Sequence, residues 1–384
     1  MQMTNTIIKA QKILVIHSGG QGGIGDTILG QPALRALRHS FPDSEIHFLG
    51  GPRQIEMLHS IFTVDKEIVF DSTVLRHSCF KGICSTLKII QSLRQQKYDV
   101  LFVLQPQLSS GAALRMGIFV RMLGVRYRYG RTLCRSKLFF THAIQEKQFG
   151  TQHEVERMKA VVGLFGAVCK NSEINIPLPA QARDNAAYFV RTQGIDSAKP
   201  CFALAPGFGK RTRSWFPERW AHVGDRLVER YDAHILIVGG QKEIELAQNI
   251  AQIMRKKPII AAGRTSLIET ATLLKQCNLV VSNDSGAMHI AAAVQTPVVA
   301  LFGPGDYHRI RPYINPEKYA IVSKNVPCAP CYKETCAMHA CMRSITVDDV
   351  FRAVMELLGS KKGVFFTDIE SEHHNRAHRL VPSQ

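Results

Sequence analysis

The stretch that decides the fold runs from residue 278 to residue 304 and reads NLVVSNDSGAMHIAAAVQTPVVALFGP. An apolar run of strand length at Leu279–Ser282 leads through a polar turn into a segment of helical period at Gly286–Val294. A second apolar run follows at Val298–Phe302. Strands that alternate with helices in this way are typical of βαβ units, so the stretch predicts an α/β fold with a parallel sheet.

The turn inside this stretch has the composition of a phosphate-binding site. Asp284 or Ser285 can cap the following helix, and Gly286 leaves the first backbone N–H groups of that helix open to an anion. Small alanines in the helix also allow it to pack closely against the sheet. Capping and tight packing alone are the simpler structural alternative, and both interpretations stay open on these residues.

The same alternation extends over most of the 384 residues, a length that favours two domains. In the first half we expect strands at Lys12–His17, Glu45–Leu49, Glu67–Phe70 and Asp99–Leu104, and helices near Asp26–Ser40, Gly82–Gln96, Ala112–Leu123 and Val155–Phe165. In the second half we expect strands at Cys201–Ala205, Ala233–Val238, Pro258–Ile260, Leu279–Ser282 and Val298–Phe302, and helices at Pro217–Arg230, Glu243–Arg255, Leu267–Gln276, Gly286–Val294 and Val347–Leu358.

A proline-containing segment, Ile174–Pro179, separates the two series and indicates an extended linker. The expected division is a Rossmann-like domain at 1–178, a second at 179–359 and a polar flexible tail at 360–384. Two such domains would leave a cleft between the carboxyl ends of their sheets, where α/β proteins bind ligands.

A second glycine-rich turn lies near the start of the chain, where the strand ending at Ile16 runs into HSGGQGGIGD, residues 17–26. Glycines let a ligand approach the helix N-terminus closely. The turn fits a dinucleotide fingerprint poorly, because the next strand ends in Phe48-Leu49-Gly50-Gly51 and lacks the expected acidic residue. Asp26 suits either a favourable first-turn acid or a general base, and burial would have to offset the helix dipole for it to act as a base.

Composition and charge narrow the function classes. Hydrophobic residues make up 45% of the chain, charged residues 21%, and Gly and Pro number 28 and 17, which excludes disordered, collagen-like and coiled-coil classes. The net charge of +17 favours an anionic partner. Basic residues concentrate in a segment free of Asp and Glu: Arg115, Arg121, Arg126, Arg128, Arg131, Arg135 and Lys137. A solvated basic face is the structural alternative.

The sequence resembles the ADP-heptose:lipopolysaccharide heptosyltransferases of glycosyltransferase family 9. The most specific match is D-S-G-x-x-H-x-A-A at Asp284–Ala292, followed by TPVVALFGP at Thr296–Pro304. The other matches are G-G-I-G-D at Gly22–Asp26, P-A-L-R-A-L at Pro32–Leu37, H-x-V-E-R at His153–Arg157, Pro206-Gly207, Arg213–Trp220, and Gly239-Gly240 with Glu243.

This resemblance implies a GT-B architecture, in which two Rossmann-like domains face each other, and transfer of heptose with inversion and without an obligatory catalytic metal. Asp26 corresponds to the family's catalytic base. The residues expected at the donor, ADP-heptose, are Lys210, Arg213, Glu243, Asp284, Ser285, Gly286 and His289. Arg213 stands where the family usually carries lysine. An ordinary packed residue is the alternative for His289.

The amino-terminal half is expected to hold a lipid-linked inner-core acceptor. The residues assigned to this acceptor are Gly23, Gly25, Arg115, Arg121, Arg128, His153 and Arg157. Exposed arginines in this half would also contact an anionic membrane surface. No run of 18 apolar residues occurs and the start lacks a signal sequence, so we expect a cytoplasmic protein at the inner face of the cytoplasmic membrane.

Two alternatives from other classes remain at this stage. One is a GT-B transferase or epimerase that uses another nucleotide sugar, because phosphate-binding turns do not read the sugar. The other is a basic module that binds nucleic acid or membranes, and the paired glycine turns and the lack of aromatic-interleaved basic strands argue against nucleic acid.

A cysteine-rich segment follows the last predicted strand, with Cys328, Cys331, Cys336 and Cys341 and nearby His339. The first pair has the spacing of a metal knuckle, so a structural metal is a candidate, and a reduced or disulfide-linked loop is the favoured alternative. No cofactor is expected to be required. The other cysteines, Cys169 and Cys277 among them, are interpreted as scattered packing residues.

Overall fold

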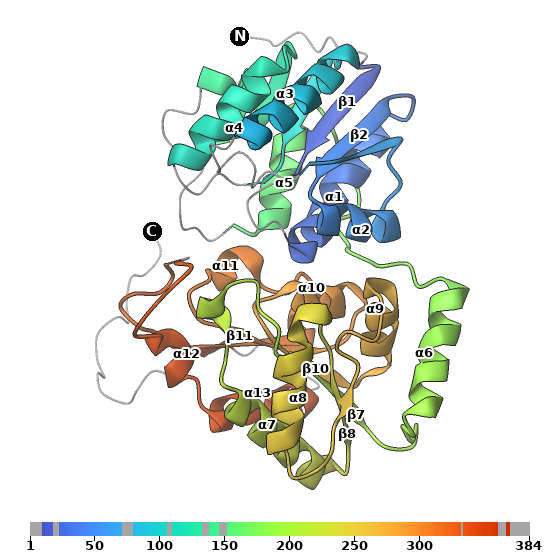
Figure 1. Ribbon diagram of the computed structural model, residues 1–384, viewed down its shortest axis with the longest axis vertical. Coiled ribbons are helices and arrows are strands. Elements are labelled where there is room, and N and C mark those ends of the chain that lie inside the picture. Colours follow the sequence, from blue (N-terminus) through green and yellow to red (C-terminus); the bar gives the residue numbers. More distant parts are fainter. Residues whose placement is uncertain are drawn as a thin grey trace, which may run out of the picture.

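The computed structural model describes residues 10–17, 23–70, 80–105, 110–132, 138–145, 152–331, 333–359 and 366–368. Within these ranges the strands form two sheets, and Figure 1 shows each sheet in a lobe of its own. All the strand pairs are parallel, as the alternation of strands and helices predicted.

The first lobe contains a six-stranded sheet with β1 near its centre. The strand order is β3 (Lys66–Val69), β2 (Glu45–Gly50), β1 (Lys12–Ile16), β4 (Val100–Val103), β5 (Tyr127–Thr132) and β6 (His142–Gln145). The chain order reverses between β1 and β4, so the carboxyl end of β1 lies at a switch point, where open α/β sheets form ligand crevices.

The second lobe contains a seven-stranded sheet with β7 and β10 side by side. The order is β13 (Phe366–Asp368), β12 (Tyr319–Ser323), β11 (Val298–Phe302), β10 (Leu279–Asn283), β7 (Cys201–Ala205), β8 (His234–Ile237) and β9 (Ile259–Ile260). Here the chain order reverses between β7 and β10, so this sheet too has a switch point at its carboxyl edge.

Helices cover both faces of each sheet, and their buried side chains fall into matching apolar clusters. In the first lobe α1 (Ile24–Ser40), α2 (Pro52–Ile61) and α5 (Glu154–Gly163) lie on one face, and α3 (Phe80–Gln95) and α4 (Ser110–Met122) on the other. In the second lobe α9 (Leu267–Gln276) and α10 (Gly286–Ala293) lie on one face, and α7 (Pro217–Tyr231), α8 (Ile244–Ile253) and α13 (Val347–Gly359) on the other.

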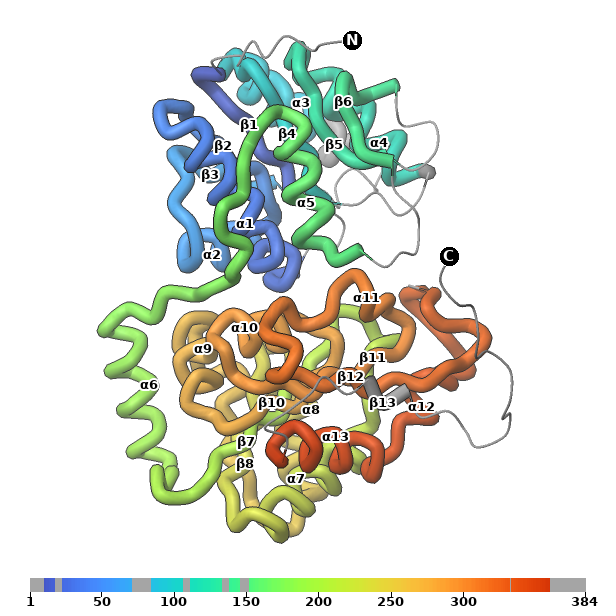
Figure 2. The backbone as a smooth tube through the Cα atoms, turned by 180° about the vertical axis from the view of Figure 1, so that it is seen from behind, coloured from blue at the N-terminus to red at the C-terminus, as the bar shows by residue number. Residues whose placement is uncertain are grey.

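The two lobes share one buried apolar cluster. It contains Val15 of β1 and Val280 of β10, and it continues through the facing helices α1 and α10. The connecting segment from residue 174 to residue 179 has no regular structure, as predicted, and Figure 2 shows it running from one lobe to α6 (Ala180–Thr192), which packs against α9. Because burial continues from lobe to lobe, the facing surfaces hold each other in place.

Several elements were not predicted. They are α2, β5, β6, α6 and β12. The sequence of β5, YRYGRT, contains two arginines that are buried in the structure, so no apolar run marks it as a strand. Within the described ranges, none of the helices has the length and apolar character needed to cross a membrane.

Candidate active site

The first part of the site is the turn between β1 and α1. The carboxylate of Asp26 accepts a hydrogen bond from the N–H of Gly23 at 3.1 Å, and the N–H of Asp26 donates to the carbonyl of Gly23 at 3.2 Å. Burial raises the pKa of the Asp26 carboxyl above its ordinary value, and the hydrogen bond from Gly23 opposes this shift. Burial therefore outweighs the favourable helix end, which the sequence left undecided. Gly19, Gly20 and Gly22 lie outside the described residues.

The second part of the site is the turn between β10 and α10. Ser285 is the N-cap residue of α10, but its side chain makes no capping hydrogen bond, contrary to one of the two predicted possibilities. The buried Asp284 also does not cap the helix, because its carboxylate pairs with the guanidinium of Arg213 at 3.1 Å. Burial raises the pKa of Asp284, and the charges of Arg213 and Lys210 act in the opposite direction. Side-chain capping therefore does not explain this turn.

These two turns meet across the junction of the lobes. A Cβ atom on Gly25 would lie 2.4 Å from Cδ2 of His289, and a Cβ atom on Gly286 would lie 3.2 Å from Cβ of Ile24. Figure 1 shows the two helices on facing sides of the junction. Glycine at both positions is what allows the starts of α1 and α10 to approach so closely.

The imidazole of His289 is a neutral group in this junction. Burial lowers its pKa to about 3, and the charges of His153 and Arg213 act in the same direction. Its Nδ1 atom is buried and has no hydrogen-bond partner among the described residues. The side chain therefore packs between the lobes, although the sequence had left an ordinary packed histidine as the alternative to a donor-binding one.

A buried ion-pair triad links the lobes next to the two turns. Glu154, at the start of α5, accepts from Arg131 of β5 at 2.5 Å and from Nε of Arg309 at 2.7 Å. Arg309 lies in α11 (Tyr307–Ile310), in the second lobe. Burial alone would raise the pKa of Glu154, but the two guanidinium groups outweigh it and hold the pKa at about 2. The ionised Glu154 in turn contributes to the raised pKa of Asp26.

His153 forms a further link between the lobes. Its Nε2 atom donates to the carbonyl of Arg311 in the second lobe at 2.9 Å, and its Nδ1 atom accepts from the N–H of Val155. Burial lowers its pKa to about 4. Arg157 is also buried, and its Nε donates to the carbonyl of Gln152 at 3.1 Å. Both residues were assigned to the acceptor, but their contacts belong to the junction and to α5.

The turn after β8 lies at the same edge of the second sheet as the turn after β10. The carboxylate of Glu243 accepts from the N–H of Gly240 at 2.8 Å. A Cβ atom on Gly207 would lie 3.1 Å from Cγ of Glu243, so the carboxylate stands beside the turn that follows β7. The side chain is only partly buried and keeps access to solvent.

The cysteine-rich segment supports the loop that carries Arg213. His339 donates through Nε2 to the carbonyl of Thr212 at 2.9 Å, and Lys210 pairs with Glu334 at 3.5 Å. The thiols of Cys328, Cys331, Cys336 and Cys341 are free. Within the described ranges, none of the groups of His, Cys, Asp and Glu side chains has an arrangement that could hold a metal ion. The candidate metal site therefore receives no support, and packing against the Arg213 loop is the observed contact.

The predicted basic face is only partly exposed. Arg115, Arg121 and Arg126 are exposed. Arg128 is buried, contrary to prediction, because its guanidinium donates to the carbonyls of Phe139 at 2.8 Å and Val125 at 2.6 Å. Arg131 is likewise buried in the triad. Arg135 and Lys137 lie outside the described residues.

Sequence reasoning missed the triad and His17. His17 follows β1, is 1% exposed, and neither ring nitrogen has a hydrogen-bond partner among the described residues. Burial lowers its pKa to about 4, and Arg131 acts in the same direction. The H-x-V-E-R motif contains Glu154 between Gln152 and Val155, but nothing in its spacing identifies Arg309, more than 150 residues away, as its partner.

Two facing parallel sheets, each with a phosphate-type turn at its switch point, define a glycosyltransferase of the GT-B architecture. Residues 86–342 match glycosyltransferase family 9 (heptosyltransferase). The chain belongs to this family.

Relatives and solved structures agree with this assignment. The chain is 25% identical over 346 residues to lipooligosaccharide heptosyltransferase 2 of Campylobacter jejuni, covering 87% of this chain and 95% of that protein. Its fold matches a family 9 glycosyltransferase of Veillonella parvula with a TM-score of 0.73 and 23% identity, covering 91% and 97% of the two chains. It also matches the Escherichia coli ADP-heptose heptosyltransferase II, with a TM-score of 0.67 and 22% identity, covering 90% and 98%.

Proposed function

We propose that this enzyme transfers a heptose from ADP-heptose to the inner core of lipopolysaccharide with inversion at the anomeric carbon. The observation that carries the proposal is the meeting of the two helix starts, with Gly25 against His289 and Asp26 one residue further along. A carboxylate and an anion-type turn then lie on opposite sides of one junction. This is the arrangement that a base and a departing diphosphate require.

Asp26 acts as the general base in this mechanism. The acceptor hydroxyl attacks the anomeric carbon from the face opposite the nucleotide, and Asp26 takes the hydroxyl proton. Its raised pKa supports the role, because proton transfer is most effective when the pKa of the base lies closer to the working pH.

The second lobe holds the donor. Negative charge grows on the departing ADP, and we assign Arg213 and the N–H groups at the start of α10 to its phosphates. Arg213 pairs with Asp284 in the structure, so its guanidinium is already held beside this turn before a phosphate arrives. Glu243 is assigned to the ribose hydroxyls, since its partly exposed carboxylate lies beside the turns after β7 and β8.

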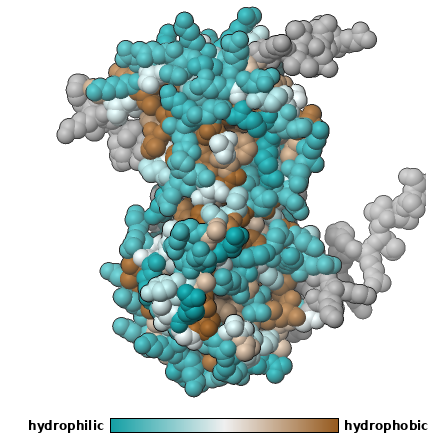
Figure 3. Space-filling model, turned by 90° about the vertical axis from the view of Figure 1, so that its right-hand side faces the viewer, coloured by the Kyte–Doolittle hydropathy of each residue, from teal (hydrophilic) through white to brown (hydrophobic). Residues whose placement is uncertain are grey.

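The first lobe holds the acceptor. Arg115, Arg121 and Arg126 are exposed, and we assign them to phosphate or carboxylate groups of the inner core and to anionic lipid beside it. Figure 3 shows hydrophobic atoms where the two lobes meet and a largely hydrophilic surface elsewhere on that face. We propose that the enzyme works at the cytoplasmic face of the inner membrane through this charge.

The test is acceptor-dependent release of ADP from ADP-heptose, measured on acceptors truncated to successive inner-core lengths. We expect release with one acceptor length only, and none when the acceptor is omitted. Release from a UDP-sugar but not from ADP-heptose would overturn the donor assignment. Arg213→Ala is expected to lower turnover by about 10²–10³-fold, because an aligned donor to the leaving charge is lost, and Arg213→Lys by less.

The membrane assignment has a separate test. Replacing Arg115, Arg121 and Arg126 together by serine should abolish binding to anionic vesicles at low salt and leave ADP release from a lipid-free acceptor analogue measurable. Unchanged vesicle binding would remove these arginines from membrane association. Binding by the unmodified enzyme should weaken as salt increases.

A further inference from the structure

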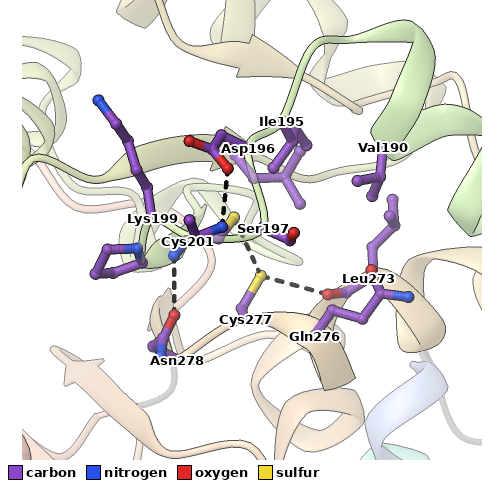
Figure 4. Close-up of a pocket in the computed structure, with 13 residues that line it drawn as sticks. Val190, Ile195, Asp196, Ser197, Lys199, Cys201, Leu273, Gln276, Cys277 and Asn278 are labelled. Carbon is purple, nitrogen blue, oxygen red and sulfur yellow. Dashed lines mark hydrogen bonds between the residues drawn. The ribbon is translucent and has the colours of Figure 1, made fainter.

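A cavity of about 550 Å³ lies at the opposite edge of the second sheet from the candidate site. It is lined by the segment from Val190 to Cys201, which joins α6 to β7, and by the end of α9 with the residues that follow it. Figure 4 shows the thiols of Cys201 and Cys277 directed toward each other beside this cavity. The mechanism proposed above uses none of these residues.

The two thiols are close and are held there by the backbone. Their Sγ atoms lie 3.9 Å apart. The N–H of Cys201 donates to Oδ1 of Asn278 at 2.9 Å, and the N–H of Asn278 donates to the carbonyl of Cys201 at 2.8 Å. Both cysteines pack in the same apolar cluster, so their side chains lie on the same face of the sheet.

The sheet register places the two backbones within reach of a disulfide. Phe202 is opposite Leu279, so Cys201 is opposite Asn278, and Cys277 is one residue further back. Neighbouring strands lie about 4.8 Å apart and rise about 3.3 Å per residue, which gives a diagonal Cα–Cα separation of about 6 Å. Disulfides span Cα–Cα separations of roughly 4.4–6.8 Å, so a bond needs rotation of the side chains and little movement of the chain.

The two thiols differ in reactivity and access. Cys201 is partly exposed and Cys277 is 7% exposed. The hydrogen bond with Cys277 lowers the pKa of Cys201, and the same contact together with burial raises the pKa of Cys277. The more accessible thiol is thus the better nucleophile, and the buried thiol is positioned to resolve what forms on it.

We propose that Cys201 and Cys277 form a thiol-exchange site that takes a small-molecule disulfide into this cavity. The Cys201 thiolate attacks one sulfur of the disulfide, whose S–S bond breaks, and the first thiol leaves with the proton that Cys201 gave up. Cys277 then loses its proton and attacks Sγ of Cys201, which releases the second thiol. Two cysteines are oxidised to one disulfide, and the reagent is reduced to two thiols.

The test is peptide mapping by mass spectrometry after the full-length enzyme is treated with oxidised glutathione. We expect a peptide cross-linked between Cys201 and Cys277 in the unmodified enzyme. Cys277→Ser should stop at a glutathione adduct on Cys201, and Cys201→Ser should lose both the cross-link and the adduct. Cys169→Ser is the matched control, since Cys169 is also a partly buried free thiol, and it should react like the unmodified enzyme.

Failure is equally defined. Absence of the Cys201–Cys277 cross-link in the unmodified enzyme, with adducts on Cys169 or on the cysteine-rich segment instead, would overturn the proposal. So would a glutathione adduct on Cys277 in the Cys201→Ser variant. The unmodified enzyme alone decides the first point, so a variant that folds poorly does not remove the test.

Discussion

The starts of α1 and α10 have the same local design and opposite electrostatic content. Each follows a strand at the switch point of a parallel sheet, and each begins at a glycine-containing turn. At α1 the protein supplies its own anion, because the carboxylate of Asp26 accepts the N–H of Gly23. At α10 the nearest carboxylate, Asp284, is drawn away to Arg213, and Ser285 makes no side-chain cap.

This difference separates two roles that one fold could have mixed. A helix start that already holds a carboxylate disfavours a second anion, so α1 suits a base acting on a neutral hydroxyl. A helix start without a side-chain cap suits a phosphate. The close approach of Gly25 to His289 then brings both roles to one junction.

The largest expected effect tests the role given to α1. Asp26→Asn should lower turnover by about 10²–10⁴-fold, because the amide keeps the shape but cannot accept the acceptor's proton. Binding of ADP, measured by calorimetry, should stay unchanged, since the donor side is intact. Turnover equal to that of the unmodified enzyme would exclude Asp26 as the base and break the distinction between the two helix starts.

The second prediction concerns the buried triad that holds the two starts together. Glu154→Gln should lower the free energy of unfolding by about 3–5 kcal/mol, because Arg131 and Arg309 would be left as buried cations without their carboxylate. Urea unfolding followed by circular dichroism measures this. Glu156→Gln is the control on the same helix. It removes a half-exposed pair with Lys159 and should cost at most about 1 kcal/mol from that pair.

The same triad predicts a pH dependence. Because the pKa of Glu154 is lowered to about 2, its contribution to stability is fully present above the ordinary glutamate pKa. It should be lost as the pH falls from there toward 2. Unfolding curves that are parallel for the unmodified enzyme and Glu154→Gln across this range would contradict the ion pair.

A smaller effect tests the approach of the two helix starts. Gly25→Ala should lower turnover by about 10²-fold, since the added Cβ would lie 2.4 Å from the His289 ring and would push α1 and α10 apart. Gly163→Ala, at the end of α5, is the control, because its Cβ would meet nothing within 4 Å. Equal activity in the two variants would show that the approach does not matter for the reaction.

The smallest effect sharpens the meaning of the raised pKa of Asp26. Above the ordinary aspartate pKa, ionisation favours the unfolded chain, because the folded pKa is raised. Asp26→Asn should therefore unfold at a higher urea concentration than the unmodified enzyme at pH 7. The difference should vanish once the pH falls below about 3.9, the ordinary aspartate pKa. A less stable variant at pH 7 would mean that the carboxylate serves structure and not catalysis.

Much of the fold could be predicted from the sequence because buried parallel strands are short apolar runs. The predictions at Cys201–Ala205 and Val298–Phe302 match β7 and β11 residue for residue. The prediction failed where a strand carries charge, as in β5, since the partners that make a buried arginine tolerable come from other elements. Cys277 was interpreted as a packing residue for the same reason, because its contact with Cys201 spans 76 positions.

The sequence by itself determined the family, the two glycine turns and the acid that follows the first of them, because these are local patterns of residue type and spacing. Only the tertiary structure decided which charges meet. It brought Glu154 between Arg131 and Arg309, paired Asp284 with Arg213, buried Arg128, and set the shift of the Asp26 pKa. Desolvation and Coulomb interactions depend on distances between groups far apart in the chain, and those distances exist only once the two sheets have folded against each other.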